Sequence, residues 1–245
     1  MRSLLIAVYS VCLAASLAAV RADDTSATSK NSSSSSSAAT DHTEHKKPAL
    51  TEEQKKASEQ FRNEQQPRME ACRDPKMDPA KCTPAYYEVH GPMTPLLRSP
   101  EVMLHANAMD GYLEFKTVLP PKLRELVILM VARRWIDQYV WNSHYTSALK
   151  RGLSRDIVDA IAEGRRPTGM SDDEDTVYEF FDELHRTYGV SDATYARALA
   201  LVGEQGIVDM VAEDGHYSFL AMMMNVARTP APKSATAPPL VPLPR

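Results

Sequence analysis

The stretch that most limits the fold is residues 120–136, where two prolines precede a run that is apolar on two sides. At helical spacing, one side carries Leu123, Leu126, Val127 and Met130, and the opposite side carries Ile128, Leu129, Ala132 and Ile136. A helix that is apolar on opposite sides is enclosed by other elements, so this one predicts the centre of a core. Glu125 lies in the middle of the second apolar side.

Residues 51–70 and most of residues 100–228 read as further helices, residues 71–100 read as a Pro-rich connector, and no alternating stretch competes as a strand. Ser, Thr or Asp residues precede most of the helical patterns, and Gly152, Gly164 and Gly189 follow three of them. The expected helices cover about residues 51–70, 100–113, 122–135, 137–151, 155–163, 171–188, 191–202 and 207–227. We therefore predict an all-α domain of seven or eight helices.

The two ends of the chain have compositions unlike that of the helical part. Residues 1–22 have a basic start, a short apolar run and small residues at the end, which predicts a secretory signal peptide and a secreted or periplasmic location. An uncut membrane anchor is the alternative, although the run is short for a span. Residues 23–50, rich in serine, and the Pro-rich residues 229–245 are expected to be disordered or extended tails.

Two cysteines, Cys72 and Cys82, remain in the mature chain and flank a loop with two prolines. In an oxidising compartment we expect a disulfide that staples a connector within residues 51–89. A redox-active thiol pair is the alternative. The formal charge is −4 without a basic block in the folded part, so we expect no nucleic-acid partner. No His, Asp or Glu cluster has metal-ligand spacing, so we predict no metal site.

Glu125 and His144 are the candidate catalytic residues. A carboxylate on an apolar helix face costs several kcal/mol unless it is paired, and a structural salt bridge to Arg133 or Arg151 is one interpretation. The other is that Glu125 orients His144, which exchanges protons near neutral pH. Arg151, seven residues after His144, lies on the same helix face and could hold a substrate carboxylate.

A resemblance adds to this reading. The segment 119–126, then Tyr139-Val140-Trp141 with His144, and Gly152-Leu153-Ser154 resemble the core motif of the carboxymuconolactone decarboxylase/alkylhydroperoxidase D family, over roughly residues 90–228. The peroxidase branch has two cysteines seven and four residues before the histidine. Here Asp137 and Val140 occupy those positions, so the thiol mechanism lacks its thiols. The decarboxylase-like branch has a glutamate where this chain has Val140.

The resemblance implies a cofactor-free enzyme, closer to a lyase than to a peroxidase, that acts on a small carboxylated or lactone-type molecule. Trp141, Asp137 and His216 join Arg151 as candidate substrate-binding residues, although a core-packing role is the alternative for Trp141 and His216. The resemblance also implies a homo-oligomer, a trimer or hexamer. A helical scaffold of the same fold that binds or oligomerises without catalysis is the alternative function. Peroxidase activity, as in the cysteine-bearing branch, is the third.

Overall fold

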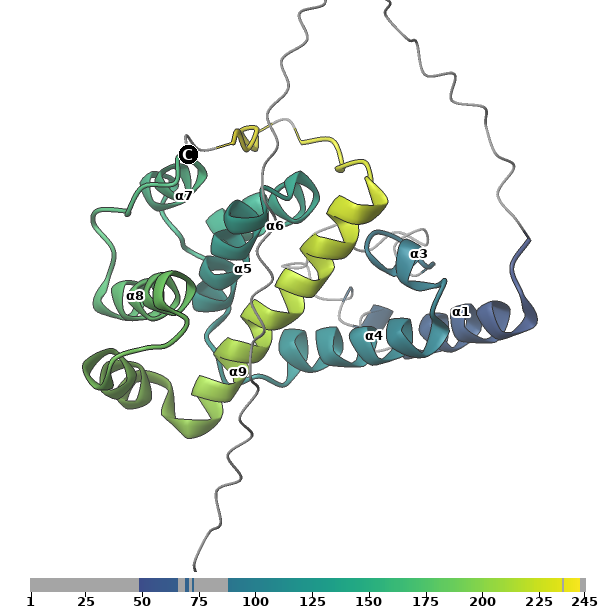
Figure 1. Cartoon of the computed structure of the whole chain (residues 1–245), viewed down its shortest axis with the longest axis horizontal. Helices are drawn as coiled ribbons and strands as arrows, with labels where there is room; N and C mark the ends of the chain where they lie inside the picture. The colour runs from purple at the N-terminus through teal and green to yellow at the C-terminus, as the bar shows by residue number, and fades with distance from the viewer. Residues whose placement is uncertain (1–48, 66–68, 71, 73–87, 235, 243–245) are drawn as a thin grey trace, which may run out of the picture. The chain divides into compact units, whose positions relative to one another are not determined.

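A computed structural model describes residues 49–65, 69–70, 72, 88–234 and 236–242. Within these residues the chain forms eight helices and no strand, which confirms the all-α prediction (Figure 1). In chain order the helices are α1 (Glu52–Glu64), α3 (Met93–Leu96), α4 (Pro100–Phe115), α5 (Pro121–Trp135), α6 (Gln138–Lys150), α7 (Arg155–Ala162), α8 (Asp172–Thr187) and α9 (Asp192–Ala227).

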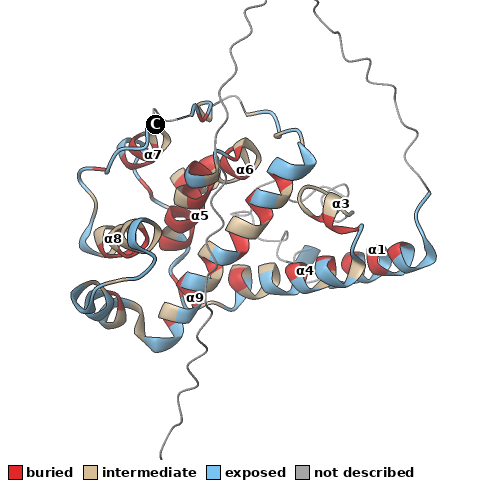
Figure 2. Ribbon diagram, viewed as in Figure 1, coloured by how far each residue is buried: buried red, intermediate tan, exposed pale blue. Residues whose placement is uncertain are grey.

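Helix α5 is the centre of the main core, as its two apolar sides predict. It contacts α6, α7, α8 and α9, and Leu126, Ile128 and Leu129 are completely buried. Figure 2 shows the buried residues concentrated on α5 and on the inner sides of its neighbours. A helix surrounded in this way holds Glu125 inside the domain, where the carboxylate has to be paired.

The helix boundaries follow the polar caps read from the sequence. The side chains of Asp137 and Ser154 accept the backbone N–H of Val140 and Ile157, at the starts of α6 and α7. Ser171 opens α8 with a capping box. Between α5 and α6 the chain turns through Ile136 (φ 51°), so that the two helices pack side by side.

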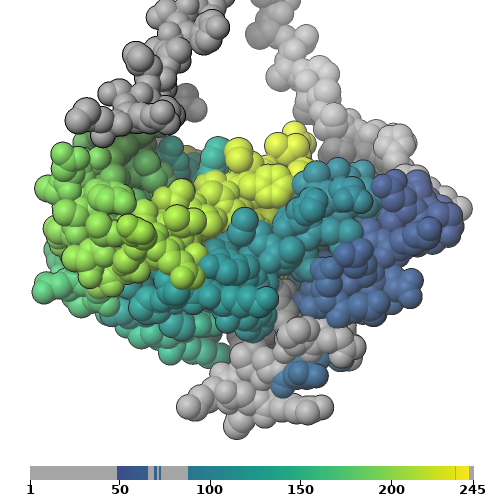
Figure 3. Space-filling view, turned by 90° about the horizontal axis from the view of Figure 1, so that it is seen from below, coloured from purple at the N-terminus to yellow at the C-terminus, as the bar shows by residue number. Residues whose placement is uncertain are grey.

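Helix α9 consists of two helical segments that meet at Gly203. The sequence predicts two helices, 191–202 and 207–227, and in the structure they join without a loop. Gly203 has φ 70° and ψ 178°, a conformation that is essentially restricted to glycine. Helix α9 contacts α8, α5 and α4, and Figure 3 shows α9 lying beside α4 on one face of the molecule.

Helix α1 packs against α4 although its sequence is mostly polar. Its inner side carries few apolar residues, but Phe61 is only 1% exposed and joins a second apolar cluster with Met93, Met103 and Leu220. The sequence predicts a polar helix over residues 51–70 with few apolar anchors, in an N-terminal segment (51–89) that precedes the domain at 90–228. In the structure the buried ring of Phe61 anchors this helix beside α4.

The described residues of the C-terminal tail, 229–234 and 236–242, contain no helix, but they are packed against the domain. They run from the end of α9 along α6 toward α7, as Figure 1 shows in yellow. Leu240 is buried in the main core, and Gln138 accepts its backbone N–H. Of the two predicted alternatives, disordered or extended, the described residues of the C-terminal tail show an extended segment that packs on the domain. Composition alone did not reveal that one leucine among the prolines has a docking position.

Several predictions fall on residues outside the described part of the chain. The signal peptide (1–22), the serine-rich linker up to residue 48, and Cys82 are among them. Cys72 is disulfide-bonded, and its pairing with Cys82 stays a prediction. Among the described helices, none combines the length and the apolar character that crossing a bilayer requires.

Candidate functional site

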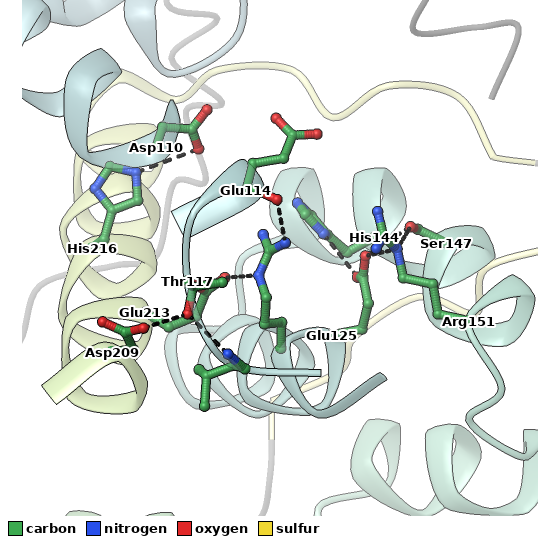
Figure 4. Close-up of polar contacts among 12 residues, drawn as sticks. Asp110, Glu114, Thr117, Glu125, His144, Ser147, Arg151, Asp209, Glu213 and His216 are labelled. Atoms are coloured by element: carbon green, nitrogen blue, oxygen red, sulfur yellow. Dashed lines mark hydrogen bonds and ion pairs between the residues drawn. The ribbon is translucent and has the colours of Figure 1, made fainter. Parts of the chain in front are cut away.

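Glu125 and His144 face each other from neighbouring helices. The turn through Ile136 and the Asp137 cap bring α6 back along α5, so two residues 19 positions apart become neighbours. The Nδ1 atom of His144 lies 3.0 Å from Oε2 of Glu125. Figure 4 shows both side chains, together with Ser147 and Arg151, pointing toward one another.

The Glu125 carboxylate is held by three side chains of the α6 segment. Besides His144 at Oε2, Ser147 Oγ donates a hydrogen bond of 2.7 Å to Oε1, and Arg151 Nε lies 3.2 Å from the same oxygen. Arg151 Nε also donates to Ser147 Oγ at 3.2 Å. Glu125 is only 4% exposed. Burial of its charge is offset by these charged and polar partners, which also set its orientation.

This arrangement assigns the two ring nitrogens of His144 different roles. An ionised carboxylate only accepts hydrogen bonds, so Nδ1 carries the proton toward Glu125. The Nε2 atom has no hydrogen-bond partner among the described residues, and His144 lines a cavity. The edge of the Tyr217 ring packs against the imidazole, with centroids 5.1 Å apart and planes at 88°. Glu125 and Tyr217 therefore fix the orientation of the His144 ring at the cavity wall.

The cavity has a volume of about 610 Å³ and is bounded by α4, α5, α6, α9, residues near α1 and α3, and the C-terminal tail. That volume is within the range of small-molecule sites. Glu125, His144 and Arg151 all line it. Four cationic side chains also border it: Arg124, Lys150, Arg151 and Lys233. The acidic wall residues besides Glu125 are Asp110 and Glu114 on α4.

A second polar cluster lies behind the α4 side of the cavity. Arg124 Nε is 3.6 Å from Oε1 of Glu213, and His216 Nε2 is 3.5 Å from Oδ1 of Asp110 (Figure 4). Glu213 is fully buried, and neither of its oxygens has a hydrogen-bond partner within the described residues. Burial raises the pKa of Glu213 to about 8, against the opposing effect of Arg124. Glu213 is therefore largely protonated at neutral pH.

Nearby Asp209 shows how a buried carboxylate is satisfied in the same helix. Its oxygens accept hydrogen bonds from Tyr112 Oη, Thr117 Oγ1 and the Val118 backbone N–H, at 2.8–2.9 Å. These bonds tie α9 to the segment between α4 and α5. Asp209 is thus a structural group, whereas Glu213 one turn later has no such donors.

Tyr217 adds a phenol group to the cavity wall. Burial, together with the carboxyl groups of Asp110 and Glu213, raises the pKa of Tyr217 well above its usual 10. The hydroxyl therefore stays protonated at physiological pH. It is a hydrogen-bond donor on the same wall as His144.

The structure brings together only some of the residues singled out in the sequence. Glu125, His144 and Arg151 share the cavity, and their proposed roles stay predictions. Trp141 is completely buried in the core, Asp137 caps α6, and His216 points toward Asp110, so these three do not line the cavity. Each is held by packing or by a local hydrogen bond. Of the α6 aromatic residues, Tyr139 rather than Trp141 reaches the cavity.

Other residues around Glu125 and the cavity were not identified as site residues from the sequence. Ser147, which donates to Glu125, lies three residues after His144 and four before Arg151, so its helical spacing could have revealed it. Lys233 belongs to the proline-rich tail, and no local pattern indicates where that tail docks. Among the described residues no group of three or more His, Cys, Asp or Glu side chains is placed to hold a metal ion.

Comparison with protein families places the site residues within a known family model. Residues 100–183 match the model of the carboxymuconolactone decarboxylase family. The matched segment includes α4 to most of α8 and therefore contains Glu125, His144, Ser147 and Arg151. None of the curated proteins matches the chain.

Proposed function

The chain belongs to the carboxymuconolactone decarboxylase family through residues 100–183, and from this premise we propose that it is an enzyme of the lyase type. Its own side chains would act as acid and base on a small carboxylated or lactone-type molecule. The observation that carries the proposal is the 3.0 Å contact between Glu125 and His144 at the wall of a cavity that also contains Arg151.

In this proposal His144 Nε2 removes a proton from, or returns one to, a carbon next to the substrate's carbonyl group. The imidazolium that forms is stabilised by Glu125, which already accepts from Nδ1. Arg151 uses Nε for its contacts with Glu125 and Ser147. Its two terminal nitrogens would bind the substrate carboxylate as a fork.

The test is His144→Gln, with His105→Gln as matched control because His105 is exposed on α4 outside this cavity. Both variants are assayed against carboxylated lactones and aromatic acids, after circular dichroism confirms folding. Loss of general acid–base catalysis predicts a rate about 10²–10⁴ lower for His144→Gln and an unchanged rate for His105→Gln. Undiminished turnover by folded His144→Gln would refute the mechanism.

A non-catalytic scaffold is the second candidate. Two observations favour it: Val140 stands where the resemblance expects a glutamate, and Glu125 is already paired with Arg151 and Ser147 without a ligand. A thermal-shift screen with aromatic acids, lactones and hydroperoxides separates the two. Stabilisation that disappears in Arg151→Met supports a ligand site. No shift with any compound supports the scaffold.

Peroxidase activity by the family's thiol mechanism is the weakest of the three candidates. The described residues that line the cavity include no cysteine, and the reaction requires a thiolate with a resolving thiol. Assays with an organic hydroperoxide and a thiol reductant test this directly. Turnover that survives Cys72→Ser would have to come from another chemistry.

Export and oligomerisation are further parts of the proposal. The signal-like residues 1–22 support export, which N-terminal sequencing of the protein made in cells would test by its start after residue 22. Exposed apolar residues on α4 and α9, among them Val102, Met109, Val208 and Val211, support self-association. Light scattering coupled to gel filtration would contradict that part if the protein is a monomer at micromolar concentration.

A further inference from the structure

The C-terminal tail contributes part of the cavity wall. Pro232, Lys233, Ser234 and Thr236 line the same cavity as His144 and Arg151. We propose that this tail segment, residues 232–234 with Thr236, determines which ligands reach His144, with Lys233 as a specificity-determining cation. The proposal rests on the proposed function only in taking this cavity as the ligand site.

Helix α6 holds the tail segment from both sides by side-chain hydrogen bonds. At its first residue, Asn142 Nδ2 donates to the carbonyl oxygen of Pro232 at 2.7 Å. After it, Gln138 Oε1 accepts the Leu240 backbone N–H at 2.7 Å, and Gln138 Nε2 donates to the Pro238 carbonyl at 3.3 Å. Gln138 Nε2 also donates to Asn142 Oδ1 at 2.6 Å. The two anchoring side chains therefore stabilise each other.

Apolar packing and a charged donor hold the far end of the tail. Leu240 is only 8% exposed and belongs to the main core. Arg133 Nη1 donates to the Val241 carbonyl oxygen at 2.8 Å. Within the tail, Ser234 Oγ accepts the Ala237 backbone N–H at 3.0 Å and forms a local turn. A segment fixed at both ends in this way behaves as a wall rather than as a loose arm.

The position of the tail segment adds positive charge away from Arg151. Asn142 holds Pro232 near the start of α6, whereas Arg151 is the C-terminal cap of the same helix. Nine residues of helix separate them, about 13 Å along the axis. Lys233 therefore contributes a cation near one end of the α6 wall, while Arg151 and Lys150 contribute cations at the other end. An anionic ligand beside His144 is attracted from both ends.

The tail segment lies outside the part of the chain that matches the family. The match ends at residue 183, within α8, and the catalytic candidates all lie before that point. The tail segment contributes to the size and charge of the cavity, and it does not include Glu125 or His144. Selectivity and chemistry would thus be carried by separate parts of this chain.

The access part of the proposal is tested by acylation of histidines with diethyl pyrocarbonate, which needs no turnover. Leu240→Ala removes the apolar anchor, and Val241→Ala is the matched control because that side chain is 60% exposed. Peptide mass spectrometry measures the rate at His144, with exposed His105 as internal reference. We expect several-fold faster acylation of His144 in Leu240→Ala and in a chain ended after Arg228. Val241→Ala should match the wild type.

An unchanged acylation rate of His144 in folded Leu240→Ala and in the shortened chain would contradict the proposal that the tail limits access to His144. The shortened chain is included only if circular dichroism shows the native helix content, and Leu240→Ala keeps the test decisive otherwise. A uniform rise at His144 and His105 also overturns it, because this pattern reports general loosening. Since no substrate is involved, these outcomes do not depend on whether His144 is catalytic.

The charge part is tested with benzoate and benzyl alcohol as probes in calorimetry. Lys233→Ala should weaken benzoate binding about two- to fivefold, the effect of a solvent-exposed charge pair, and leave benzyl alcohol unaffected. Lys233→Arg should restore binding, and Lys116→Ala, an exposed lysine at the end of α4, is the control. Equal benzoate affinity in wild type and Lys233→Ala, or no benzoate binding at all, would overturn the role of Lys233.

Discussion

Glu213 offers the sharpest test of the electrostatics around the cavity. Its carboxyl group is completely buried without a hydrogen-bond partner in the described residues, and Arg124 Nε lies 3.6 Å away. Burial raises its pKa from 4.5 to about 8. One pKa unit corresponds to about 1.4 kcal/mol, so ionising Glu213 in the folded protein costs at most about 5 kcal/mol relative to the unfolded chain.

The sign of the pH dependence follows from proton binding. Between pH 4.5 and about 8 the folded protein keeps a proton on Glu213 that the unfolded chain has released. The free energy of unfolding therefore falls as pH rises through this window, by up to about 1.4 kcal/mol per pH unit from this group. The stabilisation is complete below pH 4.5 and is lost once pH passes the folded pKa.

Glu213→Gln isolates this contribution, because glutamine has the shape of the protonated acid and does not titrate. We expect the variant to be more stable than the wild type by about 1.4 kcal/mol near pH 5.5, one unit above the unfolded pKa, and by up to about 5 kcal/mol near pH 9. Urea unfolding at pH 5.5, 7 and 9 measures the difference, followed by fluorescence of the buried Trp141.

The result that refutes this reasoning is equally specific. If Glu213→Gln is destabilised at pH 9 by as much as at pH 5.5, Glu213 is ionised throughout and forms a true ion pair with Arg124. Breaking one partner of a buried ion pair costs about 3–5 kcal/mol, so the two outcomes differ in sign at high pH. Glu204→Gln, at an exposed position of the same helix, is the control for the substitution itself.

Three further predictions concern the cap of α6 and two glycines. Asp137→Ala removes the cap and should lower the free energy of unfolding, measured with urea at pH 7, by about 1 kcal/mol. Asp137→Asn should retain most of the wild-type stability, and equal losses in both variants would contradict a capping role. Gly203→Ala should cost about 1–3 kcal/mol through its positive φ alone, since a Cβ there meets nothing within 4 Å. Gly111→Ala, in open space within α4, should instead stabilise the folded protein by up to about 1 kcal/mol. Thermal unfolding measures both variants, and an unchanged stability of Gly203→Ala would show that the chain relaxes at the bend.

The candidate site shows which of its parts are local. The pairing of Glu125 with His144 could be predicted from the sequence, because each lies on a long helix whose periodicity sets the direction of its side chain. By helical spacing, Trp141 and Asp137 lie on the same face of α6 as His144. In the structure Trp141 is buried in the core, and the Asp137 side chain caps the start of α6. Helical spacing predicts a face, whereas the neighbouring elements decide whether that face is a cavity or solid packing.

Taken alone, the sequence determined the helical class, the caps at Thr51, Ser154 and Ser171, and the buried position of α5. These features depend on residues close together in the chain, so short-range hydrogen bonds and apolar periodicity are sufficient to set them. The tertiary structure alone decided that Ser147 completes the Glu125 cluster, that Glu213 is buried without donors, and that the tail borders the cavity. Those features depend on contacts between distant segments, where one leucine or one hydrogen bond selects among docking positions that composition leaves equivalent.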